Sequence, residues 1–107
     1  MRLGIAYIFE DSDSRTKGLQ GHRIRRDECA LFVYEGMSIH KFWMKGVHTH
    51  LYLSSVVDGK CVESQFMNCN STDVHSLLTP SALVIESRVE IPVGSDVNIV
   101  GDSLVVS

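Results

Sequence analysis

The chain has few of the sequence features that assign a protein to a class at first sight. Its 107 residues contain no Gly-x-Ser-x-Gly turn, no glycine-rich phosphate loop and no internal repeat. These absences argue against the commonest serine-hydrolase, nucleotide-binding and repeat architectures. The three cysteines include no CxxC pair, and an odd number of them is typical of reduced thiols, not of a disulfide framework. What is left is enough material for one domain.

Long hydrophobic runs are also missing. The apolar run at residues 3–9 is short and leads directly into Glu10 and Asp11, so it has the shape of neither a signal peptide nor a membrane span. We interpret it as a first β-strand. The expectation that follows is a soluble, cytoplasmic protein without a membrane partner.

Neither sign of charge dominates the chain. The 10 basic and 13 acidic residues give a net charge of −3, which argues against broad binding to nucleic acid. Half of the bases lie in residues 15–26, but as many acids flank them, so residues 10–28 sum to zero and carry little long-range field. The interpretation that needs no binding function is a solvated surface. The five bases are nevertheless the best case for an anion site, and the cluster of Arg23, Arg25 and Arg26 is a candidate protein-interaction site.

Strand patterns dominate the rest of the chain. Residues 29–34 form a continuous apolar run, which is typical of a fully buried strand, and residues 51–57 alternate. Asp58-Gly59 between two apolar stretches predicts a tight two-residue hairpin. The polar residues 68–73 predict a surface loop.

Only one segment favours a helix. Ser12 or Asp13 can cap a turn or two, which Gly18 or Gly21 would end. The sequence therefore predicts a mainly β fold: a compact antiparallel β-sandwich or barrel-like single domain, residues 1–107, with one short helix after the first strand.

The pattern of residues 83–89 predicts a strand with one buried, dry face and one solvent-exposed, wet face. Alternation puts Leu83, Ile85 and Val89 on the dry face, and Glu86 and Arg88 on the other, where the two charges could pair.

Short motifs follow one another along nearly the whole chain. They are Arg15-Thr16-Lys17-Gly18-Leu19, Ala30-Leu31-Phe32-Val33-Tyr34, Phe42-Trp43-Met44-Lys45, Asp58-Gly59-Lys60, Ala82-Leu83-Val84-Ile85-Glu86 and Gly101-Asp102. In this order they resemble the domain-of-unknown-function family numbered 192, and Phe-Trp-Met-Lys is the most specific of them. The resemblance implies a compact β-sandwich or barrel-like domain with a short helix after the first strand. It implies no reaction, because the family has no established biochemical activity.

The chain also differs from that family's pattern. Gln20 stands where the family has Met, Gly46-Val47 replaces Asn-Thr, and Tyr52 stands where an Asp usually follows Leu. Any role of the family's Asn or Asp therefore does not carry over to this chain.

The tetrapeptide Phe42-Trp43-Met44-Lys45 contains the only Trp and suggests two roles. We expect it to form a strand of the sheet. If the helical turn that carries Arg15 packs beside it, then Arg15, Trp43 and Lys45 would line a groove suited to a small anionic or sugar-like ligand. Alternatively, Phe42 and Met44 point inward while Trp43 and Lys45 cover the outer surface.

Two histidines raise the question of a metal. In a strand, His48 and His50 would project to one face, which is the beginning of a zinc or copper site. A third ligand would have to come from His40, His75, Cys61 or Cys69, and the sequence does not place any of them nearby. We predict no metal site and no cofactor.

The function that the sequence favours is a small non-catalytic binding or accessory module, whose partner is an unknown small molecule or protein. One alternative is a protein-interaction factor that uses a sheet edge or the Arg23 to Arg26 cluster. The other is a metal-dependent enzyme that uses His48 and His50.

Overall fold

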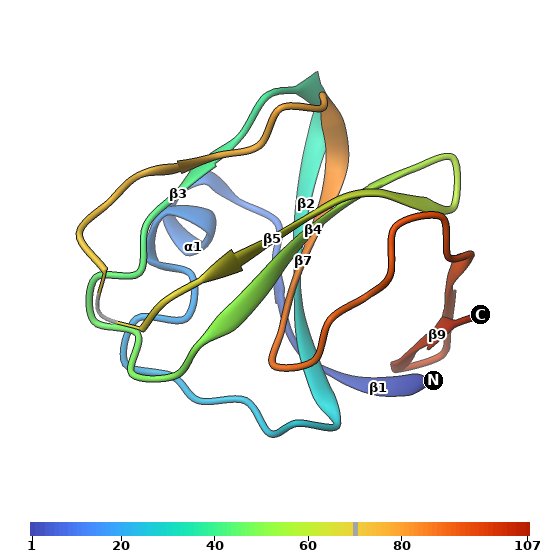
Figure 1. Cartoon of the computed structure of the whole chain (residues 1–107), viewed down its shortest axis with the longest axis horizontal. Helices are drawn as coiled ribbons and strands as arrows, with labels where there is room; N and C mark the ends of the chain where they lie inside the picture. The colour runs from blue at the N-terminus through green and yellow to red at the C-terminus, as the bar shows by residue number, and fades with distance from the viewer. Residues whose placement is uncertain (70) are drawn as a thin grey trace.

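Strands make up most of the chain, as the apolar runs and the alternation predict. The computed structural model describes residues 1–69 and 71–107, and within them it has nine strands and one helix. Seven strands form the main sheet: β1 (Arg2–Phe9), β2 (Glu28–Ser38), β4 (Leu51–Val57), β5 (Lys60–Met67), β7 (Ser81–Ser87), β8 (Val97–Val100) and β9 (Ser103–Val106). The helix α1 (Ser12–Lys17) and a two-stranded ribbon of β3 (Lys41–Phe42) and β6 (His75–Ser76) complete the fold (Figure 1).

The main sheet has the strand order β5-β4-β7-β2-β1-β9-β8. Neighbouring strands are antiparallel except β1 and β2, which run parallel. The parallel pair follows from its connection, because the segment that contains α1 carries the chain back to the end of the sheet where β1 began. The prediction of a mainly β, barrel-like domain with one short helix after the first strand is confirmed, with this single parallel pair added.

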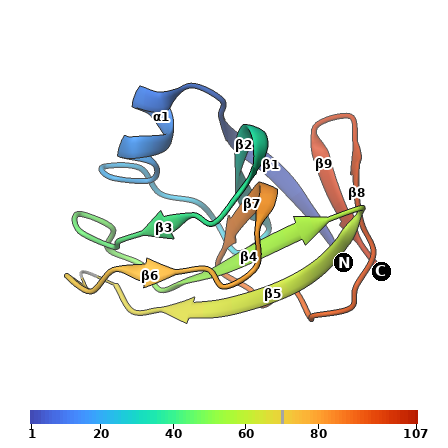
Figure 2. The ribbon, with the colours of Figure 1, turned by 90° about the horizontal axis from the view of Figure 1, so that it is seen from above.

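The sheet curls into a half-barrel. At the turn between β4 and β5, Asp58 and Gly59 have φ angles of 51° and 73°, the positive values that the predicted Asp-Gly hairpin requires. This turn reaches the start of β8 and the segment before it. The Val97 N–H donates to the Gly59 carbonyl at 2.7 Å, and the Cys61 N–H donates to the Ser95 carbonyl at 2.9 Å. The two ends of the strand order therefore meet at one corner (Figure 2).

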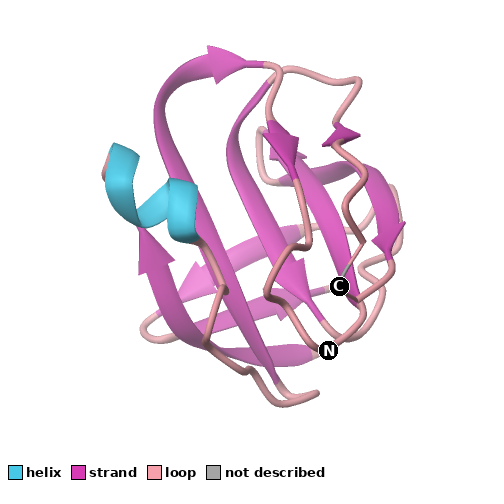
Figure 3. Ribbon diagram, turned by 90° about the vertical axis from the view of Figure 1, so that its left-hand side faces the viewer, coloured by secondary structure: helices cyan, strands magenta, loops and turns pink. Residues whose placement is uncertain are grey.

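Two apolar clusters, one on each face of the sheet, hold the fold together. The cluster inside the curl includes Leu3, Leu31, Ile85, Ile91 and Leu104, and the cluster on the opposite face includes Phe32, Met44, Leu53, Leu77 and Val84. Full burial of a side chain of this size contributes about 1.5–3 kcal/mol. Segments around α1, β3 and β6 cover the second cluster, on the side of the molecule away from β9 and both chain ends (Figure 1). Figure 3 looks onto this side of the molecule.

The helix begins slightly earlier than the sequence predicts. Its N-cap is Asp11, whose Oδ1 accepts a hydrogen bond from the Ser14 N–H at 2.7 Å, whereas the sequence pattern favours Ser12 or Asp13. The Asp11 N–H donates in return to the Ser14 Oγ at 3.3 Å, which completes a capping box. Gly18 ends the helix, as predicted. A helix of 6 residues is not stable alone, so tertiary contacts must hold it in place.

The Phe42-Trp43-Met44-Lys45 motif is only partly a strand. Phe42 ends β3, and the next three residues enter a loop that turns at Lys45 and Gly46. The expectation that the whole motif forms a strand of the sheet is therefore wrong. The alternation within it is confirmed, since Met44 is 0% exposed and Trp43 is 49% exposed.

The polar loop predicted at residues 68–73 is a loop at 68–69 and 71–73, and Asn70 lies outside the described residues. Within residues 1–69 and 71–107, no helix is long and apolar enough to cross a membrane.

Candidate functional site

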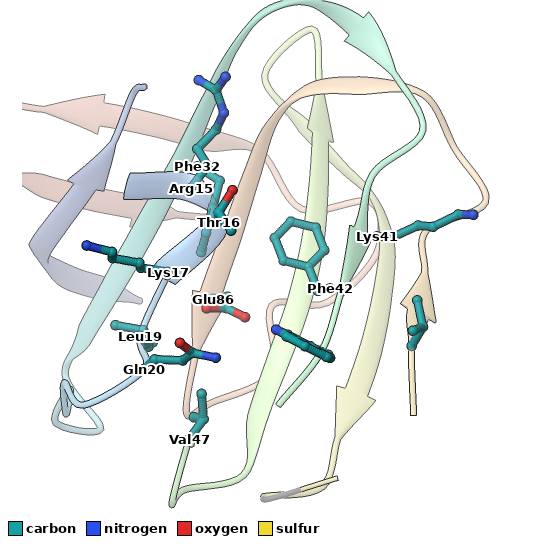
Figure 4. Close-up of a pocket in the computed structure, with 13 residues that line it drawn as sticks. Arg15, Thr16, Lys17, Leu19, Gln20, Phe32, Lys41, Phe42, Val47 and Glu86 are labelled. Carbon is teal, nitrogen blue, oxygen red and sulfur yellow. The ribbon is translucent and has the colours of Figure 1, made fainter. Parts of the chain in front are cut away.

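A pocket lies on the covered face of the sheet, and we call it the α1–β3 pocket (Figure 4). Its volume is about 320 Å³, at the lower end of the range of small-ligand sites. Residues 15–20, from α1 and the turn after it, form one wall, and the other wall is formed by Lys41, Phe42 and Trp43. The sheet contributes Phe32 and Glu86 to its base.

Glu86 is the unexpected member of the lining. It lies in β7, at the middle of the sheet, between Ala30 of β2 and Leu53 of β4, and only 4% of it is exposed. Among residues 1–69 and 71–107, no hydrogen bond or ion pair reaches its carboxyl group. Burial raises the pKa of Glu86 to about 8. At neutral pH the group is therefore mostly a carboxylic acid, with one hydrogen-bond donor and acceptor capacity beside it.

The prediction of a wet face on this strand is wrong. Alternation puts Glu86 and Arg88 on it, but Glu86 is buried, and Arg88 lies beyond the end of β7 and is half-buried. The dry face is buried as predicted at Ile85, which is 0% exposed. The reason is the second layer, because the segments around α1, β3 and β6 cover a face that a one-layer sheet would leave in water.

Most of the remaining lining is apolar. Phe32 is 1% exposed, and its ring meets the Phe42 ring edge-on, with centroids 5.1 Å apart. Gly18 brings the end of α1 down onto Phe32, since a Cβ at this position would lie 3.2 Å from the Phe32 Cζ. The φ angle of Gly18 is 49°, so the close approach and the backbone both require glycine here.

Arg15 lines the pocket, but its guanidinium already contacts two backbone carbonyl groups and an aromatic ring of the protein. Its Nη1 donates to the carbonyl of Glu10 and, at 2.9 Å, to the carbonyl of Val33. Its Cζ lies 4.8 Å from the centroid of the Tyr34 ring. These contacts link α1 to β2. They also leave Arg15 with fewer N–H donors for a ligand than the predicted anionic or sugar-binding groove would need.

Trp43 and Lys45 differ in their position relative to the pocket. Trp43 lines the α1–β3 pocket together with Arg15, whereas Lys45 is not part of the lining. The Lys45 Nζ instead lies 5.6 Å from the centroid of the Trp43 ring. Two of the three predicted groove residues therefore share one concavity.

The polar side chains of the lining differ in their exposure and in the hydrogen bonds that they already make. Lys17 and Lys41 are exposed at the rim. The Thr16 hydroxyl donates to the Ser12 carbonyl at 2.8 Å. Gln20 is half-buried, and no hydrogen bond of its amide side chain occurs within the described ranges.

The two candidate metal ligands do not lie in a strand. His48 and His50 precede β4, and the Nδ1 of His50 accepts a hydrogen bond from the Cys69 N–H at 3.1 Å. In the part of the chain that the structure describes, no three His, Cys, Asp or Glu side chains come together to hold a metal ion. The third ligand that a metal site needs is therefore not found there.

The arginine cluster lies in the connection between α1 and β2, and all three side chains are exposed. The Arg25 Nε is 3.8 Å from the Glu28 Oε1, and 82% of the Arg25 side chain is exposed. An ion pair this exposed contributes little to stability. The role of Arg23, Arg25 and Arg26 in binding a protein stays a prediction.

Comparisons with known proteins bear on the fold. No protein-family model and no curated protein matches the chain. The structure is similar to one from Sinorhizobium meliloti 1021 that is named as a candidate transcription regulator, with a TM-score of 0.73, 22% identity, and coverage of 79% of this chain and 67% of that one. It is also similar to a protein of unknown function from Novosphingobium aromaticivorans DSM 12444, with a TM-score of 0.69, 18% identity, and coverage of 75% of this chain and 59% of that one. At these identities the likeness shows the fold alone.

Proposed function

We propose that this domain is a small non-catalytic binding or accessory module that holds a small molecule in the α1–β3 pocket. The observation that carries the proposal is an apolar, aromatic cavity of about 320 Å³ with the buried Glu86 carboxyl at its base. A concave apolar site with a few polar groups in fixed positions is the usual form of a small-molecule site. A buried carboxyl without a partner destabilises the fold, and a ligand that bonds to it would offset this cost.

The sequence motifs favour an anionic or sugar-like ligand, and the pocket has features that suit each. Trp43 offers a half-exposed aromatic face, and Lys17 and Lys41 bring positive charge to the rim. Arg15 and Lys45 contribute less than the motifs imply, because the first is bonded to carbonyl groups and the second lies outside the lining.

A ligand screen with matched variants tests the proposal. Ligand-observed NMR on mixtures of small sugars, organic anions and neutral ring compounds should give hits that W43A weakens by about fivefold or more, since a ring contact of this kind contributes about 1 kcal/mol. F66A is the matched control, because Phe66 is 48% exposed against 49% for Trp43 but lies in β5, away from the pocket. Hits that weaken equally in both variants, or a broad library without a hit, would contradict the proposal.

A second candidate function is binding to a protein partner through a sheet edge. β8 is the last strand in the sheet order, and Ile99 and Val100 on it are 53% and 54% exposed. Such an edge can pair with an extended segment of another protein. A pull-down with Ile99→Pro, and another with charge reversal at Arg23, Arg25 and Arg26, separates the two surfaces, and an unchanged partner list in both would remove this candidate.

We also propose that the chain is related to the domain-of-unknown-function family numbered 192. Residues from four of the motifs that carry the resemblance meet at the α1–β3 pocket: residues 15–19, Phe32, the pair Phe42 and Trp43, and Glu86. Motifs that lie far apart in the sequence but surround one cavity are consistent with a shared site. If the proposal is right, aligned members should keep a glycine at the position of Gly18 and an aromatic residue at that of Phe32.

A further inference from the structure

The groups at the base of the α1–β3 pocket favour a different ligand class from the anionic or sugar-like one that the sequence motifs suggest. We infer that the pocket takes a small, flat, uncharged molecule with a cis-amide edge, such as a primary aromatic amide or a lactam, which the Glu86 carboxyl holds through a pair of hydrogen bonds. The inference rests on the proposed function, because it takes the α1–β3 pocket to be a binding site.

No cation of the described residues is placed to balance a charge on Glu86. On α1, the Arg15 guanidinium is bonded to two carbonyl groups, and Lys17 is exposed. Lys41 of β3 is also exposed. Arg88 follows Glu86 by two residues, but no ion pair joins them in the ranges that the structure covers. The carboxyl therefore stays desolvated without compensation, which favours its neutral form.

The sheet around Glu86 adds no further charge. Its neighbour in β4 is Leu53, and its neighbour in β2 is Ala30. Tyr34, farther along β2, has a pKa raised to about 12, chiefly by burial, so it is neutral near pH 7. A ligand that reaches the base of the pocket therefore meets a neutral carboxylic acid in apolar surroundings.

A carboxylic acid and a cis-amide are complementary. The acid presents one O–H donor and one carbonyl acceptor, and the amide edge presents one carbonyl acceptor and one N–H donor, so both bonds form without a proton moving. A carboxylate ligand presents acceptors only, so it leaves the acid's carbonyl oxygen unmatched. An amidinium presents donors only, so it pairs with both oxygens only after the acid has released its proton. An unmatched buried group costs about 1–3 kcal/mol.

The rest of the lining fits a flat ring better than a polyol. The Thr16 hydroxyl already donates to the Ser12 carbonyl. Apart from the exposed lysines, Glu86 and Gln20 are therefore the polar side chains of the lining, within the described residues, without a hydrogen bond of their own. The Glu86 carboxyl alone can satisfy an amide edge. The remaining hydroxyl groups of a sugar would face the rings of Phe32 and Phe42, where they would lose hydrogen bonds to water without replacement.

Three isosteric probes test the inference: benzamide, benzoate and benzamidine, which share a ring but differ in charge and in donors. Binding is followed by amide-shift titration of the ¹⁵N-labelled domain. At about pH 6.5, benzamide should bind the pocket about tenfold more tightly than benzoate, whereas benzamidine should bind with release of the Glu86 proton. At about pH 9.5 the carboxyl is ionised, so benzamide should weaken by about fivefold or more while benzamidine gains affinity.

Two variants make the test specific. E86Q keeps a donor and an acceptor without a charge, so it should bind benzamide with the same affinity at both pH values, whereas the exposed control E90Q should behave as wild type. E86L should lose the preference for benzamide and bind toluene instead, which also shows that the pocket is still folded. Equal or tighter binding of benzoate at about pH 6.5, or an affinity for benzamidine that does not rise with pH, would overturn the inference.

The outcomes also separate this inference from the proposed function. If methyl glucoside or inorganic phosphate shifts the resonances of the pocket and benzamide does not, the ligand class is wrong and the binding site stands. If no probe, including these two, shifts them, both are overturned.

Discussion

Glu86 of β7 lies opposite Leu53 of β4 in the register of the sheet, so a titratable carboxyl stands between apolar neighbours at the base of a pocket. This position makes Glu86 a source of instability in the free domain. The protonation state of Glu86 can therefore be read in a stability measurement.

The stability of the domain should therefore fall as the pH rises. The pKa of Glu86 is about 8 in the folded state against 4.5 as its ordinary value, so the folded chain binds more protons between these values. The contribution is fully present below about pH 4.5 and is lost as the pH rises through about 8, with a slope of up to about 1.4 kcal/mol per pH unit. Urea unfolding of wild type and E86Q across this range measures it. E86Q should remove most of the slope, E90Q should keep it, and an unchanged slope in E86Q would contradict the account.

Arg15 should act mainly as an anchor between α1 and β2. Replacement by Ala removes its hydrogen bonds to the Glu10 and Val33 carbonyls and its contact with Tyr34, which should lower the free energy of unfolding by about 1.5–3 kcal/mol. Lys17→Ala on the same helix is the control and should change it by less than about 0.5 kcal/mol. Equal effects of the two replacements in urea unfolding would show that the Arg15 contacts do not contribute to the free energy of unfolding.

Trp43 and Met44 should differ sharply although they are neighbours. Met44 is 0% exposed, so Met44→Ala should cost about 2–5 kcal/mol, whereas Trp43 is 49% exposed and its replacement by Ala should cost less than about 2 kcal/mol. Thermal and urea unfolding of the two variants measure the difference. A loss of stability in Trp43→Ala as large as in Met44→Ala would mean that Trp43 belongs to the core and not to a binding surface.

Gly18 should tolerate no side chain, for two separable reasons. Gly18→Ala combines a φ of 49° with a Cβ at 3.2 Å from Phe32, and it should cost about 2–3 kcal/mol. Gly21→Ala has a φ of 73° but nothing within 4 Å, so it measures the backbone part alone, at about 1 kcal/mol. Equal losses in the two variants would show that α1 does not press on Phe32.

Local patterns in the sequence predict the strands and the tight turn well. Asp58-Gly59 specifies its hairpin because positive φ angles are needed at both positions, and an uninterrupted run such as 29–34 identifies a strand covered on both faces. The parallel pairing of β1 with β2 was not predictable in this way. It depends on where the connection through α1 returns, which no short stretch of residues encodes.

The candidate site could be predicted only in part, for a related reason. Arg15 and Trp43 were found because their motifs stand out in the chain, and the structure places both on the α1–β3 pocket. Glu86 was missed because alternation in β7 assigns it to a face but does not say whether another layer covers that face. The one available signal was an acid at the end of the apolar run Leu83-Val84-Ile85, and the same pattern is common on exposed strands.

The most direct test of the account is a ¹³C NMR titration of the Glu86 side-chain carboxyl in the folded domain, with and without benzamide. The account predicts a midpoint at about pH 8 in the free domain and a higher midpoint when benzamide is bound, because the ligand pairs with the protonated acid. A midpoint near the ordinary value of 4.5, unmoved by benzamide, would show that Glu86 is solvated and that the pocket is not built around a neutral carboxyl group.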